Sequence, residues 1–114
     1  MRLLLDSTFP EATKEHPRKN VSMERFVAGD VADRQLLEYA AANAFDAVVF
    51  MGRDALVAKD LRHGVAETGI AVVATTAREP TLAQDQLVRN LGRLERRAKP
   101  GRIYVLLSDS MVEE

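Results

Sequence analysis

Three aspartates stand at positions where a parallel sheet would gather its chemistry. Asp6 ends the apolar run Leu3–Leu5, Asp54 follows the run Ala47–Met51, and Asp33 begins an amphipathic segment between them. Carboxyl ends of parallel strands and the starts of the following helices share one edge of a sheet, so these carboxylates are expected to converge. Carboxylates held together repel one another, and a hard divalent cation relieves that repulsion. The pattern therefore predicts a Mg²⁺ or Mn²⁺ site able to hydrolyse a phosphodiester.

Each aspartate also has a purely structural interpretation. Aspartate is a preferred helix N-cap, and Asp33 and Asp54 both precede amphipathic segments. Asp6 differs, because Thr8 and Glu11 have the spacing of a capping box and would start the next helix without it. Asp6 is therefore the acid for which a functional role is most strongly expected.

The apolar runs that would carry these acids are nearly continuous, which is typical of strands covered on both faces of a parallel sheet. They are Leu3–Leu5, Ala47–Met51, Ile70–Ala74 and Ile103–Leu107, with a weaker edge candidate at Val21–Phe26.

Helical patterns lie between the runs. Asp33 would cap a helix that buries Leu36, Leu37, Ala40 and Ala41, and Asp54 one that buries Val57, Leu61 and Val65 and ends at Gly69. Thr81 and Gln84 form a second capping box, which opens a helix from about Thr81 to Ala98. The alternation predicts a single domain, 1–114, with an α/β fold: a three-layer α/β/α sandwich around a mostly parallel sheet of about five strands.

The long helix carries a cluster of positive charge. Arg89, Arg93, Arg96 and Arg97 fall within about a quarter-turn of one another, and Leu87, Leu91, Leu94 and Ala98 lie opposite. Such a cluster suits an anionic partner, RNA or an acidic protein segment, although a solvated outer face is the simpler interpretation.

Composition excludes several classes of function. The chain has 114 residues, a net charge of −1 and no cysteine, so disulfides, thiolate metal sites and cysteine nucleophiles are excluded. No apolar run reaches the roughly 18 residues of a membrane helix and no signal-peptide pattern opens the chain, so no membrane partner and a cytoplasmic location are expected. Nucleotide-binding glycine motifs and the serine-hydrolase elbow are absent.

The chain resembles the short PIN-like domains of VapC-type toxin ribonucleases from bacterial toxin–antitoxin modules. The resemblance is carried by four stretches: MRLLLD at the start, DRQLLEYAA from Asp33, FDAVVFMGRD from Phe45 to Asp54, and ETGIAVVATT from Glu67. It implies a PIN-like fold, with Asp6, Asp33 and Asp54 as catalytic and metal-binding acids for Mg²⁺ or Mn²⁺. It also implies endonucleolytic cleavage of RNA that leaves a 5′-phosphate, and restraint by a cognate antitoxin protein. The sequence leaves the oligomeric state open, with a homodimer as one possibility.

Some positions depart from the family pattern. Leu56 stands where the family often has the second acid of Asp-x-Asp, Ser7 replaces the usual Asn or Glu, and Gly52 stands where Thr is common. A catalytically degenerate module that binds RNA or protein is therefore the main alternative. A phosphoacceptor receiver domain is a third possibility, but it needs paired acids after the first strand and an Asp ending the third, where Ser7 and Met51 stand.

Overall fold

A single mixed sheet forms the centre of the molecule. The computed structural model describes residues 1–10, 19–27, 31–57 and 59–114, and within them the sheet has six strands in the order β2-β1-β3-β4-β5-β6. The strands are β1 (Arg2–Leu5), β2 (Ser22–Arg25), β3 (Ala47–Phe50), β4 (Ala71–Thr75), β5 (Ile103–Leu106) and β6 (Met111–Glu113). All neighbouring pairs are parallel except β5 with β6. The four apolar runs and the edge strand are thus confirmed, and β6 is an addition that the sequence patterns missed.

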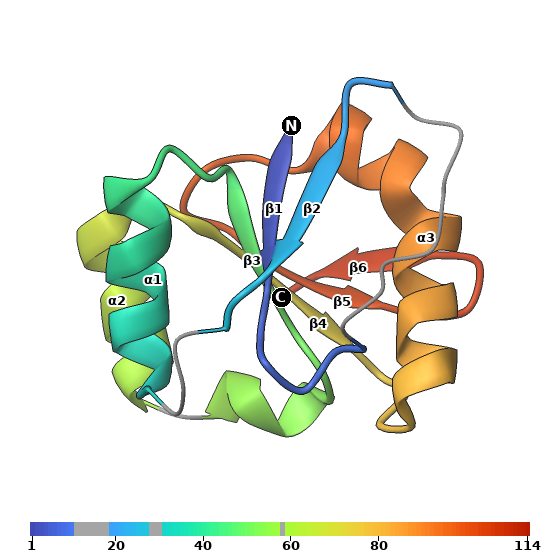
Figure 1. Ribbon diagram of the computed structural model, residues 1–114, viewed down its shortest axis with the longest axis horizontal. Helices are drawn as coiled ribbons and strands as arrows, with labels where there is room; N and C mark the ends of the chain where they lie inside the picture. The colour runs from blue at the N-terminus through green and yellow to red at the C-terminus, as the bar shows by residue number, and fades with distance from the viewer. Residues whose placement is uncertain (11–18, 28–30, 58) are drawn as a thin grey trace.

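Helices cover both faces of the sheet, as expected for a three-layer α/β/α arrangement. In Figure 1, α1 (Asp33–Ala42) and α2 (Lys59–Thr68) lie on one side and α3 (Pro80–Arg97) on the other. Two separate core clusters result: Leu4, Val48 and Val72 pack toward α1 and α2, and Leu3, Leu5 and Val73 pack toward α3. Side chains alternate between the faces along each strand, and both faces are buried, which explains the continuous apolar runs.

The start of α1 differs from its prediction. Ala32 is the N-cap, Asp33 is the first helical residue, and the Gln35 side chain accepts the Ala32 N–H at 3.0 Å. Leu36, Leu37 and Ala40 are buried as predicted, but Ala41 is exposed. The α1 cap is therefore supplied by Gln35 reaching back to the backbone, and the prediction of an Asp33 cap is wrong.

Asp54 also caps no α-helix, because it lies in a separate 3₁₀ helix, η1 (Arg53–Val57), that precedes α2. Leu61 and Val65 are buried as predicted, whereas the side chain of Val57 lies outside the described part of the structure. Glu11, the predicted capping-box partner of Thr8, also lies outside the described residues. Gly69 ends α2 with φ +71°, and its N–H donates to the Val65 carbonyl at 2.9 Å. A left-handed residue at this position is the usual reason for a glycine after a helix.

The N-cap of α3 is Glu79, in place of the predicted Thr81. The Glu79 carboxylate accepts the N–H groups of Thr81 at 3.1 Å and of Leu82 at 2.9 Å, and Pro80 takes the first helical position. Proline is favoured there because its missing N–H would have no helical partner. The buried side of α3 contains Leu87, Leu91 and Leu94 as predicted, with Ala98 packed at its end.

In the described residues, no helix combines the length and apolar character needed to cross a membrane.

Candidate functional site at the carboxyl edge of the sheet

A hollow of about 320 Å³ lies at the carboxyl edge of the sheet, the lower edge in Figure 1. Its lining residues come from the segments that follow three strands and from the start of α3: Thr8, Met51, Gly52, Asp54, Arg78 and Pro80. The chain turns outward in opposite directions from β1 to β2 and from β3 to β4, which makes β1 and β3 the switch point of the sheet. Ligands of open α/β sheets bind outside the carboxyl ends of strands at such a point.

Asp6 connects two walls of this hollow. Its Oδ1 accepts the Thr8 N–H at 2.9 Å and the Thr8 hydroxyl, and its Oδ2 accepts the Met51 N–H at 3.1 Å. Its own N–H donates to the Val49 carbonyl at 3.0 Å. The expectation that Asp6 has no structural role is therefore wrong: the carboxylate joins the segment after β1 to the end of β3.

Thr75, the last residue of β4, makes the second connection. Its hydroxyl accepts the Gly52 N–H at 3.1 Å and donates to the Ala77 carbonyl at 2.7 Å, and its side chain is fully buried. Gln86 on α3 adds to this wall, because its Oε1 accepts the N–H groups of Thr76 at 3.1 Å and of Ala77 at 3.0 Å. The turn at Gly52 and the segment that carries Arg78 are thereby held in one arrangement.

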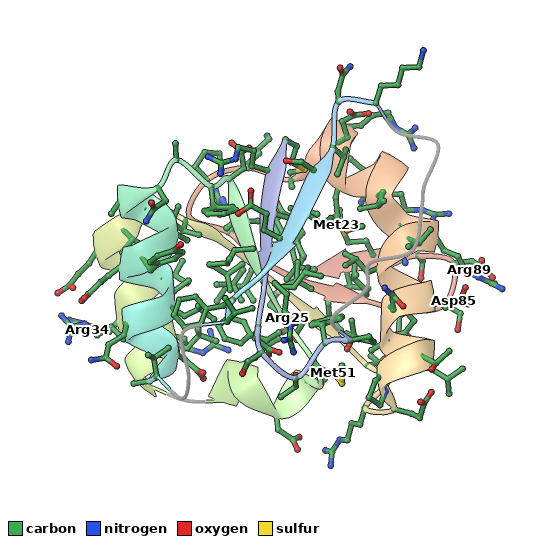
Figure 2. All side chains as sticks on the ribbon, in the orientation of Figure 1. Met23, Arg25, Arg34, Met51, Asp85 and Arg89 are labelled. Atoms are coloured by element: carbon green, nitrogen blue, oxygen red, sulfur yellow. The ribbon has the colours of Figure 1, made fainter. Side chains whose placement is uncertain are left out.

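Arg25, at the end of edge strand β2, supports the segment after β1. Its guanidinium donates to the carbonyls of Ser7 at 3.2 Å and Phe9 at 3.4 Å. Figure 2 shows Arg25 and Met51 toward the same lower edge of the molecule. The part of the chain that contains Asp6 and Thr8 is therefore fixed from both neighbouring strands of β1.

Asp54 lies at the mouth of the hollow and is paired with Arg78. The Arg78 Nη2 donates to Asp54 Oδ2, and both side chains are highly exposed, 70% for Arg78 and 73% for Asp54. The turn beneath them needs a glycine, because Gly52 has φ +90°, and a Cβ there would lie 3.5 Å from the Arg78 Cγ. The backbone of the turn thus passes directly under the Arg78 side chain.

The predicted triad of acids is not assembled into a metal centre. Asp33 begins α1, on the face of the sheet opposite α3, although α1 starts at the same edge (Figure 1). In the described ranges no group of three or more histidine, aspartate or glutamate side chains is placed to hold a metal ion. Both oxygens of Asp6 receive protein hydrogen bonds, and Asp54 receives Arg78. A cation at this edge would therefore compete with protein donors for Asp6 and Asp54.

Leu56 is directed away from the hollow. Its side chain is 3% exposed and belongs to the core cluster beneath α1 and α2. The position where the resemblance leads one to expect a further acid is therefore a core position in this fold.

The arginine face of α3 is only partly available to a partner. Arg89 pairs with Asp85 at 3.0 Å and with Asp109 at 3.5 Å, and Figure 2 shows Asp85 and Arg89 side by side on the outer side of the helix. Arg93 donates to the Asn90 side chain at 3.2 Å. Over the described ranges, no hydrogen bond or ion pair engages the guanidinium groups of Arg96 and Arg97. The unneutralised charge is thus concentrated at the end of α3.

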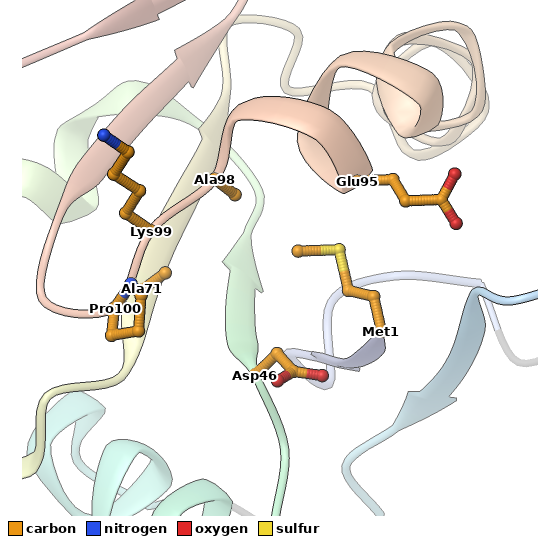
Figure 3. Close-up of a pocket in the computed structure, with 7 residues that line it drawn as sticks. All are labelled: Met1, Asp46, Ala71, Glu95, Ala98, Lys99 and Pro100. Atoms are coloured by element: carbon orange, nitrogen blue, oxygen red, sulfur yellow. The ribbon is translucent and has the colours of Figure 1, made fainter.

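A second hollow, of about 330 Å³, lies at the opposite, amino edge of the sheet. Figure 3 shows the Met1 side chain between Asp46 and the end of α3, with Lys99 and Glu95 directed away from each other. The lining is Met1, Asp46, Ala71, Glu95, Ala98, Lys99 and Pro100. Because its charged groups do not converge on one point, this hollow has less of the character of a binding site than the carboxyl-edge hollow.

Sequence reasoning identified Asp6 and Asp54 but missed Thr75, Arg78 and Gln86. The only sequence signal for Thr75 is a pair of threonines, Thr75 and Thr76, directly after a buried apolar run. Polar residues at that point of a parallel strand lie at the ligand edge of the sheet.

No family model, no curated protein and no solved structure matches this chain. The order of β2, β1, β3, β4 and β5 is the flavodoxin-like order of doubly wound folds, which hosts many unrelated functions. Function must therefore be argued from the side chains at the hollow and on α3.

Proposed function

We propose that this protein is a PIN-like module that binds single-stranded RNA and does not cleave it. The observation that supports this proposal over cleavage is that the two carboxylates are engaged by protein donors. Asp6 accepts hydrogen bonds from the N–H groups of Thr8 and Met51, and Asp54 accepts one from the Arg78 guanidinium. Leu56 is buried at the position of a further acid. This is the degenerate alternative that the sequence departures favour, and a cytoplasmic location is part of the same proposal.

RNA is the favoured partner because of the charge on α3. Several arginines have a carboxylate partner within 4 Å, among them Arg34 with Glu67 and Arg89 with Asp85. Within the described chain, Arg96 and Arg97 have neither a carboxylate partner nor a hydrogen bond from the guanidinium group. Neutralising phosphates with free guanidinium groups releases counterions and supplies affinity that does not depend on sequence. Because α3 runs from Pro80, which lines the hollow, to Arg97 near the opposite edge of the sheet, a strand that contacts both regions would follow the helix over about 27 Å.

Fluorescence anisotropy with a labelled single-stranded RNA over a series of salt concentrations tests this function. We expect affinity to fall steeply with salt, and the Arg96→Ala, Arg97→Ala double variant to reduce the slope by about 1–2. Arg89→Ala is the matched control, because this arginine is on the same helix but already paired with two carboxylates. The proposal would be contradicted if the control and the double variant lost RNA affinity equally, or if the wild type bound no RNA.

A metal-dependent endoribonuclease, the toxin of a toxin–antitoxin pair, is the second candidate. It is favoured by the position of two acids around one hollow: Asp54 lines it, and Asp6 is bonded to Thr8 and Met51, which also line it. The Asp54–Arg78 pair is a surface pair, worth about 0–1 kcal/mol, and a cation could displace it. Cognate antitoxin binding and a homodimer belong to this candidate.

Incubation of varied RNAs with Mg²⁺ or Mn²⁺ separates the two candidates. RNA cleavage by the wild type that is lost in Asp54→Asn would establish the ribonuclease and overturn the non-cleaving module. Asp54 is preferred to Asp6 for this experiment, because Asp54 is 73% exposed and its replacement affects only the surface pair with Arg78.

A further inference from the structure

We propose that the Asp54–Arg78 pair at the mouth of the carboxyl-edge hollow recognises one ribonucleotide of the bound RNA. Arg78 would bind a phosphate, and Asp54 would accept a hydrogen bond from the ribose 2′-hydroxyl. The inference rests on the proposed RNA-binding function and adds to it a site and a basis for choosing RNA over DNA.

The size and position of the hollow suit a small ligand. Its volume, about 320 Å³, is at the lower end of the range of ligand sites, and it lies at the β1/β3 switch point of the sheet. A site of this size accommodates one unit of a polymer, with the rest of the strand outside.

The walls of the hollow are held in place before any ligand arrives. Asp6 bonds the segment with Thr8 to Met51, and Thr75 bonds Gly52 to Ala77, the residue before Arg78. A site whose supporting groups are already ordered loses less entropy when it binds.

Arg78 can bind a phosphate while it remains paired with Asp54. A guanidinium has five N–H donors in a planar fork, and among the described residues only the Nη2 bond to Asp54 uses one of them. The side chain is 70% exposed above Gly52, so its remaining donors are accessible to a ligand.

Asp54 supplies the complementary half of the recognition. An ionised carboxylate only accepts hydrogen bonds, and within the described chain Arg78 is its one protein donor. The ribose 2′-hydroxyl is a donor, and it is the group that allows a protein to distinguish RNA from DNA. DNA lacks the 2′-hydroxyl, so the Asp54 carboxylate would lie beside an anionic strand without this hydrogen bond.

The test compares oligonucleotides of one sequence as RNA, DNA and 2′-O-methyl RNA, by anisotropy in EDTA so that no metal-dependent cleavage occurs. We expect the wild type to bind RNA about tenfold more tightly than DNA, because a site built to bond a hydroxyl rejects the analogue that lacks it. The 2′-O-methyl strand has no 2′ donor and is expected to bind as weakly as DNA.

Variants assign the preference to the two residues. Asp54→Ala should abolish the RNA preference without weakening DNA binding, whereas Arg78→Ala should weaken RNA and DNA alike. Glu38→Ala, an exposed acid on α1 paired with Arg34, is the control and should leave the preference unchanged.

The possible failures are distinguishable. If the wild type binds RNA and DNA equally, or if Asp54→Ala keeps the preference, the inference is overturned and RNA binding stands. If the wild type binds no RNA, the proposed function and the inference fall together.

Discussion

Asp6 has a structural role that its position in the sequence conceals. Its two oxygens accept backbone N–H groups from Thr8 and from Met51, on either side of the switch point. At the scale of single residues, the carboxyl edge is therefore organised by side chains that bond to backbone, with Asp6 and Thr75 at its centre.

Asp6→Asn should destabilise the fold by about 1–2 kcal/mol, because an amide offers one acceptor oxygen in place of two and leaves one donor unsatisfied. Urea unfolding measures the change. Ser7→Ala, at the exposed neighbouring residue, serves as the control and should stay within about 0.5 kcal/mol of the wild type. A fully stable Asp6→Asn protein would contradict the structural role.

Thr75→Val should cost about 1–3 kcal/mol, since the valine keeps the shape but leaves the Gly52 N–H and the Ala77 carbonyl without their partner. Thr75→Ser retains the hydroxyl and should cost less. Amide hydrogen exchange at Gly52 gives a local measurement: protection should fall in the valine variant and persist in the serine variant. Equal protection in both variants would show that the hydroxyl does not hold the turn.

Two local elements decide the shape of the hollow, the turn at Gly52 and the start of α3. The turn requires a left-handed residue, and α3 begins where Glu79 caps it. Each is a short segment with an identifiable physical requirement, so each can be altered separately.

Gly52→Ala should destabilise the protein by about 1–2 kcal/mol, because φ +90° is unfavourable for a residue with a Cβ. Gly92→Ala, which adds the same methyl group within α3, carries no such backbone strain. Chemical denaturation of both variants checks this, and equal effects would exclude backbone strain as the cause.

The Glu79 cap should make stability depend on pH. Hydrogen bonds from the Thr81 N–H and then the Leu82 N–H lower the pKa of Glu79 in the folded state. A lowered folded pKa means that the carboxylate stabilises the protein above the unfolded pKa of about 4.3 and that this is lost as pH falls through the folded value. The melting temperature of Glu79→Gln should therefore lie below that of the wild type at pH 7 and approach it as the pH falls through the folded pKa of Glu79. A gap that does not change with pH would argue against the charged cap.

At the scale of the whole molecule, the two layers of helices bury both faces of the sheet. Burial of both faces places the strand residues in the core, so binding is left to the residues beyond the strand ends and to the outer surfaces of the helices. Leu56 illustrates the consequence, because η1 is packed against the core and its position 56 is directed inward.

Leu56→Asp restores the Asp-x-Asp pattern in the sequence but should not create a metal ligand. We expect a loss of more than about 3 kcal/mol, from lost apolar burial and an unpaired buried charge. Leu56→Met, of similar volume, should cost less than about 1.5 kcal/mol. Unfolding curves with and without Mg²⁺ check this, and stabilisation of Leu56→Asp by the metal would contradict the proposed orientation of this residue.

The amino-acid sequence by itself determined the layered α/β architecture. Continuous apolar runs such as Ala47–Phe50 are buried on both faces, and the leucines of α3 recur at helical spacing, so local pattern and final burial agree. The helix caps were less predictable. Gln35 and Glu79 accept the hydrogen bonds at the starts of α1 and α3, whereas local sequence rules assign the caps to Asp33 and Thr81.

Only the tertiary structure decided what the acids do. Asp6 meets Met51, Thr75 meets Gly52 and Asp54 meets Arg78 across 45, 23 and 24 positions of the chain. A sequence pattern states which strand ends share an edge, but which donors reach a carboxylate depends on the paths of the connecting segments. That is why the sequence could place Asp6 and Asp54 at this edge without indicating that Met51 and Arg78 would donate hydrogen bonds to them.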